Sequence, residues 1–368
     1  MTRSTPLHDR HTALGASFTD FGGWSMPVRY TSDLAEHHAV RTAAGLFDIS
    51  HMAEFDVTGP SAATFLDVAL AGRLSSMKVG RAKYSLLLTE TGGVLDDVIV
   101  YRLADEHFLL ISNAGNRDLV ATALAERAAA FTDVTVVDRT DELSLLAVQG
   151  PSARAVLEAT AGISAVEPAL ADLGYYAWSA ASFDGVELMI LRTGYTGEDG
   201  FELLVPNAQA SALWDAVLAA GEPHGLVPAG LAARDTLRLE AGMPLHGHEL
   251  SVDIRPAQAG MGRVVAADKE SFVGKDALAT ADAEAPVLVG LVAEGRRAGR
   301  AGYAVLDAEG TTIGEVTSGA LSPTLGHPIA MAFVAPASAA VGTDLFIDVR
   351  GTRIPATVTA LPFYRRNA

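Results

Sequence analysis

Apolar residues alternate with other residues in two runs that flank a pair of glycines, and this pattern predicts a β-hairpin. The runs cover 84–89 and 94–101, and the turn between them contains Gly92 and Gly93. Glycine accepts the positive φ that a tight hairpin turn requires. We therefore expect a strand, a turn and a second strand here.

The second strand of this hairpin contains two adjacent carboxylates, Asp96 and Asp97. Successive side chains on a strand point to opposite faces, so each aspartate is expected among apolar neighbours. A carboxylate in such a place must be hydrogen-bonded, solvated at the strand end, or functional. A solvated pair just past a turn is the commoner explanation, and the pattern alone leaves the choice open.

Two further polar residues follow or interrupt apolar strands. The strand 107–112 runs into Asn113, and strand ends often carry ligand-binding side chains, although a turn or cap asparagine is the general alternative. Glu202 lies within the apolar run 201–205, after a connection with glycines at 194, 197 and 200. That connection has no Gly-Lys-Ser/Thr, so it does not match a phosphate-binding P-loop.

Helices are expected at 33–44, 117–130 and 228–242, with Asp33 as a cap of the first and Pro228 at the start of the last. A strand followed by Gly-Pro-Ser and a helix occurs twice, at 55–61 and at 143–152, and Ser61 is expected to cap the helix after the first copy. The repetition predicts two related α+β halves rather than a solenoid, whose repeats are shorter.

The C-terminal quarter differs in composition and pattern. A linker rich in Ala, Asp, Glu and Pro at 282–286 precedes six short apolar runs separated by turns, which predict a small barrel or sandwich. We therefore expect a region 1–281 made of two interleaved α+β lobes and a domain 286–368. Arginines that could meet an anionic partner or a carboxylate gather in this part: Arg296, Arg297, Arg300, Arg350, Arg353, Arg365 and Arg366.

Composition excludes several classes of function. The 368 residues include 27 basic and 44 acidic side chains, a net charge of −17, which opposes binding to nucleic acid and to anionic membranes. The chain has no cysteine, so disulfides, cysteine nucleophiles and thiolate metal sites are excluded. The N-terminus is polar, and no apolar run approaches the ~20 residues of a membrane span, so we expect a cytoplasmic protein.

The stretch from His246 to Glu249 reads His-Gly-His-Glu and invites a metal-binding interpretation. No third histidine follows at ligand spacing, so we expect no metal site there.

Seven motifs, in order along nearly the whole chain, resemble those of the glycine cleavage T-protein family, the tetrahydrofolate-dependent aminomethyltransferases. They are Phe21–Pro27, Gly45–Met52, Gly92–Asp97, Ser112–Gly115, Gly194–Glu202, Gly230–Asp235 and Leu361–Tyr364. The resemblance implies an α+β, three-lobed fold: two related α+β lobes and a C-terminal β-barrel around a central folate site.

The resemblance also implies a reaction and its partners. The enzyme would transfer the aminomethyl carbon from the lipoyl arm of H protein to tetrahydrofolate, the co-substrate, without a metal. The products would be 5,10-methylenetetrahydrofolate, ammonia and dihydrolipoyl H protein, in glycine catabolism.

Site residues follow from the same resemblance, position by position. Asp97 matches the catalytic aspartate of the family and Glu202 the glutamate that recognises the pterin, whereas Asp96 is expected to be structural. The remaining matches are folate-contacting positions: Tyr84, Asn113, Tyr195, Arg234 and Arg366. Arg365 is the alternative to Arg366.

Other proteins that handle folate give three alternative interpretations. Folate domains of dimethylglycine or sarcosine oxidation accompany an FAD domain, for which this chain has neither the length nor a Gly-x-Gly-x-x-Gly motif. A folate-binding accessory protein of iron–sulfur assembly would carry a cysteine motif, and this chain has no cysteine. A non-catalytic paralogue is the third alternative.

Overall fold

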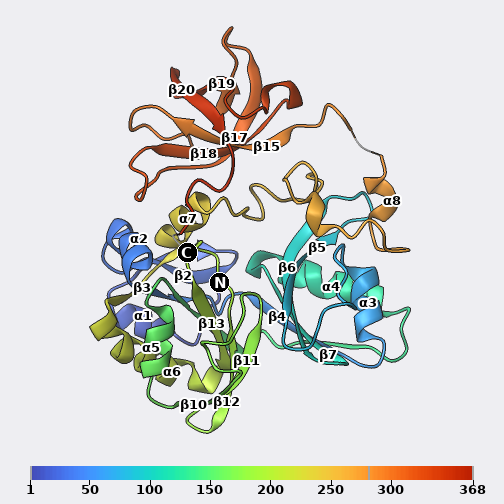
Figure 1. Ribbon diagram of the computed structural model, residues 1–368, viewed down its shortest axis with the longest axis vertical. Coiled ribbons are helices and arrows are strands. Elements are labelled where there is room, and N and C mark those ends of the chain that lie inside the picture. Colours follow the sequence, from blue (N-terminus) through green and yellow to red (C-terminus); the bar gives the residue numbers. More distant parts are fainter. Residues whose placement is uncertain (1, 281, 367–368) are drawn as a thin grey trace.

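The computed structural model describes residues 2–280 and 282–366 and has three parts (Figure 1). Two lobes, each built on a β-sheet, lie side by side, and a closed β-barrel lies against one end of them. No helix in the described part of the chain is both long and apolar enough to span a bilayer.

The first lobe is an antiparallel five-stranded sheet with the order β5-β6-β7-β4-β8. Helices α3 (Ala62–Ala69) and α4 (Arg117–Ala128) cover one face, where Phe55, Phe65 and Leu124 are buried together. The strands are β4 (Ala53–Thr58), β5 (Ala82–Leu88), β6 (Val94–Ala104), β7 (His107–Ser112) and β8 (Thr135–Asp138). The predicted hairpin is therefore β5 and β6, with Gly92 in the turn at a φ of 84°.

The second lobe is a seven-stranded sheet with the order β10-β11-β12-β13-β9-β3-β14. Its strands are β3 (Ala44–Asp48), β9 (Leu143–Gln149), β10 (Ile163–Glu167), β11 (Trp178–Phe183), β12 (Val186–Leu191), β13 (Gly200–Pro206) and β14 (Leu226–Pro228). Only β3 and β14 pair in parallel among the described strands.

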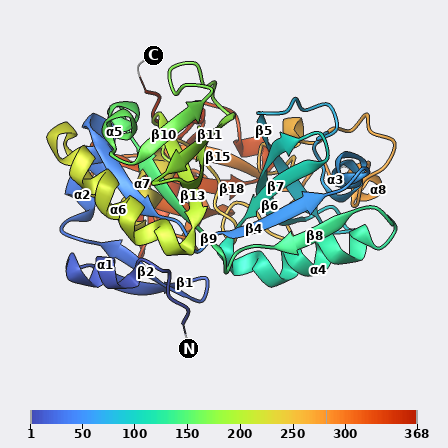
Figure 2. The same cartoon turned by 90° about the horizontal axis from the view of Figure 1, so that it is seen from below.

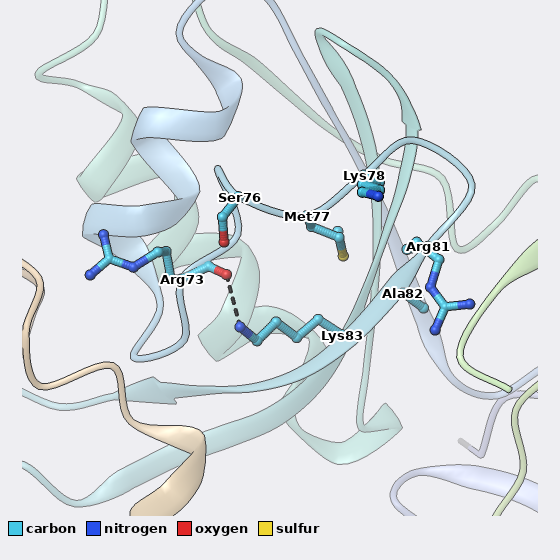
Figure 3. A pocket seen from close by; sticks show the side chains of 7 residues that line it. All are labelled: Arg73, Ser76, Met77, Lys78, Arg81, Ala82 and Lys83. Atoms are coloured by element: carbon cyan, nitrogen blue, oxygen red, sulfur yellow. Dashed lines mark hydrogen bonds between the residues drawn. The ribbon is translucent and has the colours of Figure 1, made fainter.

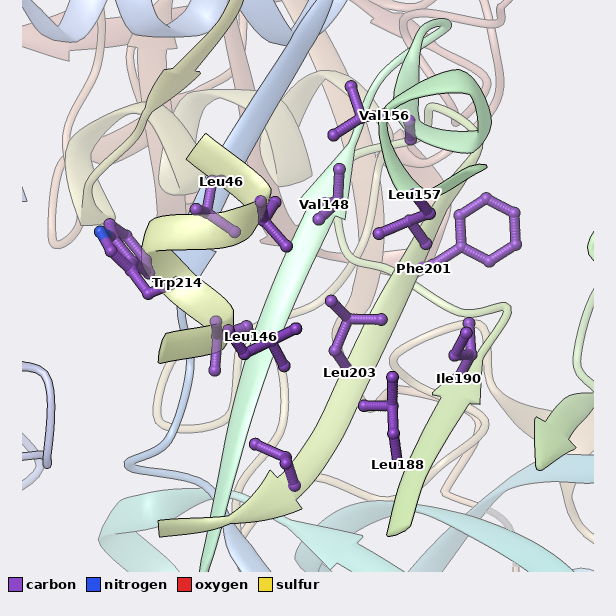
Figure 4. Packing of buried hydrophobic residues seen from close by; sticks show 14 of the residues in the cluster. Leu46, Leu146, Val148, Val156, Leu157, Leu188, Ile190, Phe201, Leu203 and Trp214 are labelled. Atoms are coloured by element: carbon purple, nitrogen blue, oxygen red, sulfur yellow. The ribbon is translucent and has the colours of Figure 1, made fainter. Parts of the chain in front are cut away.

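Helices cover both faces of the second sheet. On one face, α5 (Ala153–Ala159) and α6 (Asn207–Gly221) pack on strands β9, β12 and β13, with Trp214 fully buried (Figure 4). On the other face, α2 (Asp33–Thr42) and α7 (Leu231–Glu240) share a core with residues of both sheets. This shared core joins the two lobes. The N-terminal helix α1 (His8–Ala13) and the hairpin of β1 (Ser17–Phe21) and β2 (Trp24–Arg29) lie beside the second lobe (Figure 2).

The predicted repetition is visible in the backbone of both lobes. The glycines that follow β4 and β9, Gly59 and Gly150, adopt nearly the same left-handed φ of 124° and 131°. The strand order β5-β6-β7-β4-β8 of the first sheet corresponds to β11-β12-β13-β9-β14 of the second, except that β3 is inserted between β9 and β14 and β10 is added at the edge beside β11. The two lobes are thus related, and the second is completed by a strand from an earlier part of the chain.

The C-terminal part is a closed six-stranded barrel with the order β15-β18-β17-β16-β19-β20. Of the two predicted architectures, a barrel or a sandwich, the structure therefore has the barrel. Its strands are β15 (Val287–Ala293), β16 (Ala304–Leu306), β17 (Thr312–Leu321), β18 (Pro328–Val334), β19 (Asp344–Val349) and β20 (Thr352–Thr359). Leu239 of α7 packs against Ile329 and Met331 of the barrel.

A long connection, which we call the covering segment (residues 241–280), runs from α7 across the hairpin of the first lobe and contains the short helix α8 (Lys275–Leu278). Leu250, Ala259 and Phe272 of this segment pack on Leu86 and Val94 of the hairpin. The backbone N–H of Val94 donates to the carbonyl of Ser251 at 2.9 Å. The segment therefore covers one end of the β5–β6 hairpin.

Several local predictions were wrong. Strand β3 was not predicted, because all five of its residues are buried and show no alternation of apolar and polar positions. Helix α7 begins at Leu231, since Pro228 belongs to β14. Ser32 rather than Asp33 caps α2, and the Ser61 hydroxyl donates to Asp133 instead of capping α3.

Candidate functional site

A cavity of about 300 Å³ lies where the two lobes and the covering segment meet. Most of its lining is apolar, with Ile99, Ile111 and Leu145 among the wall residues. Six of the seven predicted site residues line it: Tyr84, Asp97, Asn113, Tyr195, Glu202 and Arg234. The fold thus gathers residues from β5, β6, β13, α7 and two loops into one concave site.

Asp97 is held at the wall of this cavity by two donors. Tyr84 Oη donates to Oδ2 at 3.0 Å, and Asn113 Nδ2 donates to Oδ1 at 2.8 Å. Burial raises the pKa of Asp97, and the hydrogen bonds from Tyr84 and Asn113 oppose that rise. Burial and the neighbouring Asp97 raise the pKa of Tyr84 well above its usual value, so Tyr84 donates as a neutral phenol.

Asp96 lies on the opposite face of β6, as the strand alternation predicts, and does not line the cavity. It is fully buried and accepts hydrogen bonds from the backbone N–H of Asn113 at 3.0 Å and from Asn113 Nδ2 at 2.8 Å. Asn116 Nδ2 donates to it at 2.7 Å. Burial and the charge of Asp97 raise the pKa of Asp96 to about 7.

Glu202 projects from β13 into another part of the same cavity. Its Oε2 accepts from the Thr193 hydroxyl at 2.6 Å, and no hydrogen bond to Oε1 is found among the described residues. Burial raises the pKa of Glu202, while Thr193 and the charge of Arg234 lower it. The arrangement leaves one carboxylate oxygen free to accept from a ligand.

Arg234 and Tyr195 form a stacked pair beside Glu202. The guanidinium of Arg234 lies 4.7 Å from the centre of the Tyr195 ring, and Tyr195 Oη donates to the carbonyl of Pro244. Burial lowers the pKa of Arg234, and the charge of Glu202 opposes this effect. Arg234 nevertheless stays charged because a guanidinium is protonated at any ordinary pH.

Arg366 is the predicted site residue that the structure does not place in this cavity. It lines a separate hollow of about 290 Å³ together with Arg365, Tyr364 and Glu198, and its Nη1 lies 3.6 Å from Asp199 Oδ1. Met243 lines both the hollow and the main cavity, so the two adjoin. Arg365, the predicted alternative, lines the same hollow.

Two histidines in the cavity lining were not predicted as site residues. His51 is buried, its Nδ1 has no partner among the described residues, and burial together with Arg234 lowers its pKa to about 4. It belongs to the motif Gly45–Met52, which was the signal that could have identified it. His246 was considered only as a metal ligand, yet it lines the cavity and contacts Asn116.

The other polar residues of the His246–Glu249 stretch have structural partners. His248 Nδ1 bonds to the carbonyl of Thr317 at 2.8 Å, and Glu249 Oε2 accepts from Arg238 and from the backbone N–H of Leu245. Residues 2–280 and 282–366 contain no group of three or more His, Asp or Glu side chains placed to hold a metal ion.

A basic hollow of about 450 Å³ borders β5 near Lys83, the neighbour of Tyr84 on the opposite face of the strand (Figure 3). Its cations are Arg73, Lys78, Arg81 and Lys83, and Lys83 Nζ donates to the carbonyl of Arg73 at 3.0 Å. This hollow was not predicted, because the predicted basic cluster lies in the C-terminal part of the chain.

Comparisons with known proteins agree with this architecture. A family model described as the GCVT N-terminal domain matches residues 7–269, and one described as the glycine cleavage T-protein C-terminal barrel domain matches residues 287–365. The chain is 55% identical to an aminomethyltransferase of Cutibacterium acnes, covering 99% of each chain. It is 54% identical to an aminomethyltransferase of Saccharopolyspora erythraea, covering 100% of this chain and 99% of the relative.

A crystal structure of the glycine cleavage system aminomethyltransferase T from Bartonella henselae has the same fold. It superposes with a TM-score of 0.91 at 39% identity and covers 99% of this chain and 98% of that one. Both family models, the full-length relatives and the shared three-part structure lead to one assignment. The chain belongs to the glycine cleavage T-protein family.

Proposed function

We propose that the chain transfers the aminomethyl carbon from the lipoyl arm of H protein to tetrahydrofolate within the cavity lined by Asp97 and Glu202. Its full-length relatives are aminomethyltransferases, and aminomethyl transfer in the glycine cleavage system is the activity of this chain. The observation that carries the site assignment is the convergence of six family-matched residues on one cavity.

Glu202 binds the pterin in this proposal. The amino group and adjacent ring N–H of a pterin form a pair of donors that one carboxylate accepts side by side. The free Oε1 of Glu202 and its position in the cavity wall support this role. Arg234 and Tyr195 lie beside it and complete the folate-binding wall.

Asp97 acts on the carbon that is transferred. The bond between carbon and the lipoyl sulfur breaks, the carbon becomes bonded to the two folate nitrogens, and ammonia leaves. The two protons lost by those nitrogens end on ammonia and on the lipoyl thiol. A cationic, iminium-like species forms as sulfur leaves, and a fixed carboxylate stabilises that charge and positions the attacking nitrogen.

The geometry around Asp97 supports this electrostatic role. Tyr84 and Asn113 each donate to one of its oxygens, so the carboxylate is held in one orientation before substrate arrives. The sulfur belongs to the partner, which explains why a chain without cysteine handles a thioaminal.

The remaining assignments extend the same proposal. Arg366, or its neighbour Arg365, meets the carboxylates at the glutamate end of the folate, because the hollow they line adjoins the cavity at Met243. We assign residues 1–281 to folate binding and transfer, and 286–368 to a barrel domain. We place the reaction, which uses no metal, in the cytoplasm, since a chain without cysteine fits a reducing compartment.

One experiment tests the function directly. The purified chain is incubated with aminomethylated H protein and tetrahydrofolate, and ammonia and 5,10-methylenetetrahydrofolate are measured. We expect both products in equal amounts, and much slower ammonia release when tetrahydrofolate is omitted. A chain that forms neither product would be a non-catalytic paralogue.

A further inference from the structure

Asp96 and Asp97 point to opposite faces of β6, yet a single side chain connects them. Asn113 Nδ2 lies 2.8 Å from Asp96 Oδ1 and 2.8 Å from Asp97 Oδ1, so the two hydrogens of one amide serve the two carboxylates. The backbone N–H of Asn113 adds a third bond, to Asp96 Oδ2 at 3.0 Å. Asp96 thereby fixes the position of the amide that holds Asp97.

A second amide extends this connection back to the cavity. Asn116 Nδ2 donates to Asp96 Oδ1 at 2.7 Å and lies 3.1 Å from His246 Nδ1. An amide nitrogen only donates, so His246 accepts at Nδ1 and carries its hydrogen on Nε2, which lies 3.3 Å from the carbonyl of Val94. Asp96 therefore orders two side chains that line the cavity, Asn113 and His246.

We propose that Asp96 is a positioning residue for the transfer reaction, which orients Asp97 through Asn113 and orients His246 through Asn116. The inference rests on the proposed role of Asp97 at the transferred carbon. Asp96 touches no substrate in this arrangement, because it is fully buried behind the strand.

Tyrosines and a histidine surround Asp97 in the cavity. Tyr84 donates to it from β5, and Tyr176, Tyr195 and His246 stand near it in the same cavity. Burial and carboxylate neighbours raise the pKa values of all three tyrosines, so these side chains are neutral at neutral pH. The charge of Asp97, together with burial, raises the pKa of Asp96 to about 7, so Asp96 takes up a proton near neutral pH.

The test compares Asp96→Asn, Asp96→Glu and Asp97→Asn with the wild type in the complete assay with H protein, across pH. For Asp96→Asn we expect the pH profile of kcat/KM to lose the part of its acid limb near pH 7 that reflects protonation of Asp96, because an amide does not titrate. We expect kcat to fall about 10-fold with a KM for tetrahydrofolate within about twofold of wild type. Asp96→Glu keeps a titrating carboxyl group and should keep that part of the acid limb.

Two further variants make the result decisive. Asp56→Asn makes the same chemical change on β4 of the same sheet, where Asp56 pairs with His107 and Arg139 away from the cavity, and should leave the profile unchanged. Asn116→Ala removes one donor of Asp96 without removing its charge, and should lower kcat with little effect on KM even if Asp96→Asn does not fold.

Failure of the inference and failure of the proposed function give different results. If Asp96→Asn keeps the wild-type kcat and acid limb while Asp97→Asn is inactive, Asp96 has no positioning role. If Asp96→Asn does not fold and Asn116→Ala keeps the wild-type kcat, the inference is also wrong. Near-normal turnover by Asp97→Asn would instead overturn the function assigned to Asp97.

Discussion

Arg41 and Glu240 form a buried ion pair, with Arg41 Nη2 2.8 Å from Glu240 Oε2, that connects α2 to α7. The other oxygen of Glu240 accepts from the Ser322 hydroxyl and from the backbone N–H of Thr324, both between β17 and β18 of the barrel. One carboxylate therefore ties the second lobe to the barrel.

Replacing this carboxylate should destabilise the whole chain. Burial alone would raise the pKa of Glu240, but hydrogen bonds from His37, Ser322 and Arg41 outweigh it and hold the pKa at about 2. We expect Glu240→Gln to lower the free energy of unfolding by about 3 kcal/mol at pH 7, measured by urea titration. In the wild type this contribution is present above pH 4.5 and is lost as the pH falls towards 2. Glu158→Gln, which removes an exposed pair with Arg154, should cost far less.

Asp97→Asn tests the proposed chemistry. The amide keeps the size of the side chain but not its charge, so we expect transfer to slow by about 100-fold or more while folding is retained. Tetrahydrofolate binding, followed by calorimetry, should change much less than turnover. Equal losses in binding and turnover would mean that Asp97 is mainly a binding residue.

Glu202→Ala tests the proposed pterin contact. Loss of two charge-assisted hydrogen bonds should weaken tetrahydrofolate binding by about 10- to 100-fold. Glu187→Ala is a matched control, because Glu187 is an exposed glutamate on the neighbouring strand β12. An unchanged dissociation constant for Glu202→Ala would rule out the contact.

His51 should make the chain less stable in mild acid. Its pKa is about 4 in the folded chain, against an ordinary value near 6.5, because burial and Arg234 disfavour the charged ring. As the pH falls, His51 is protonated at a higher pH in the unfolded chain than in the folded chain. The free energy of unfolding therefore falls by about 3 kcal/mol from this group between about pH 6.5 and pH 4. His51→Gln should remove that part of the pH dependence in urea titrations, whereas His38→Gln, at an exposed position of α2, should not.

Gly93→Ala should disrupt the contact between the hairpin and the covering segment. A Cβ at this position would lie 1.7 Å from the carbonyl oxygen of Val252, so the backbone of the segment would have to move. We expect a loss of about 3 kcal/mol in the free energy of unfolding and weaker tetrahydrofolate binding. Gly262→Ala is the control on the same segment, since its nearest neighbour lies 4.0 Å from the added atom. Similar stabilities for the two variants would contradict this view of the segment.

Local patterns in the sequence were sufficient to predict much of the fold. The alternation around Gly92 and Gly93 predicted β5 and β6, and the six apolar runs after Pro286 correspond to β15–β20. Strand β3 escaped detection because a strand buried on both faces has no alternating pattern. The relatedness of the two lobes was visible only through the repeated Gly-Pro-Ser.

The candidate site was predictable in part, and for a different reason. Motifs matched to the family identified six of the residues that line the cavity, while apolar surroundings alone singled out Asp96, Asp97 and Glu202. The link from Asp96 to Asn113 and Asn116 depends on how the end of β7 packs beside β6, and no spacing in the sequence encodes that distance. The enclosure of the cavity depends on the covering segment, which is far along the chain.

The insertion of β3 between β9 and β14 has a consequence for the order in which the chain can fold during synthesis. Every strand of the first sheet has left the ribosome once Asp138 has emerged, so that sheet can pair early. The second sheet is not complete until β14 (Leu226–Pro228) has been synthesised and can pair with β3. Strand β9 can pair with one edge of β3 soon after Asp138 has emerged, but the other edge of this buried strand must be kept from pairing with other chains until β14 is made. A nascent chain is thus most exposed to aggregation between the completion of its first sheet and the completion of its second.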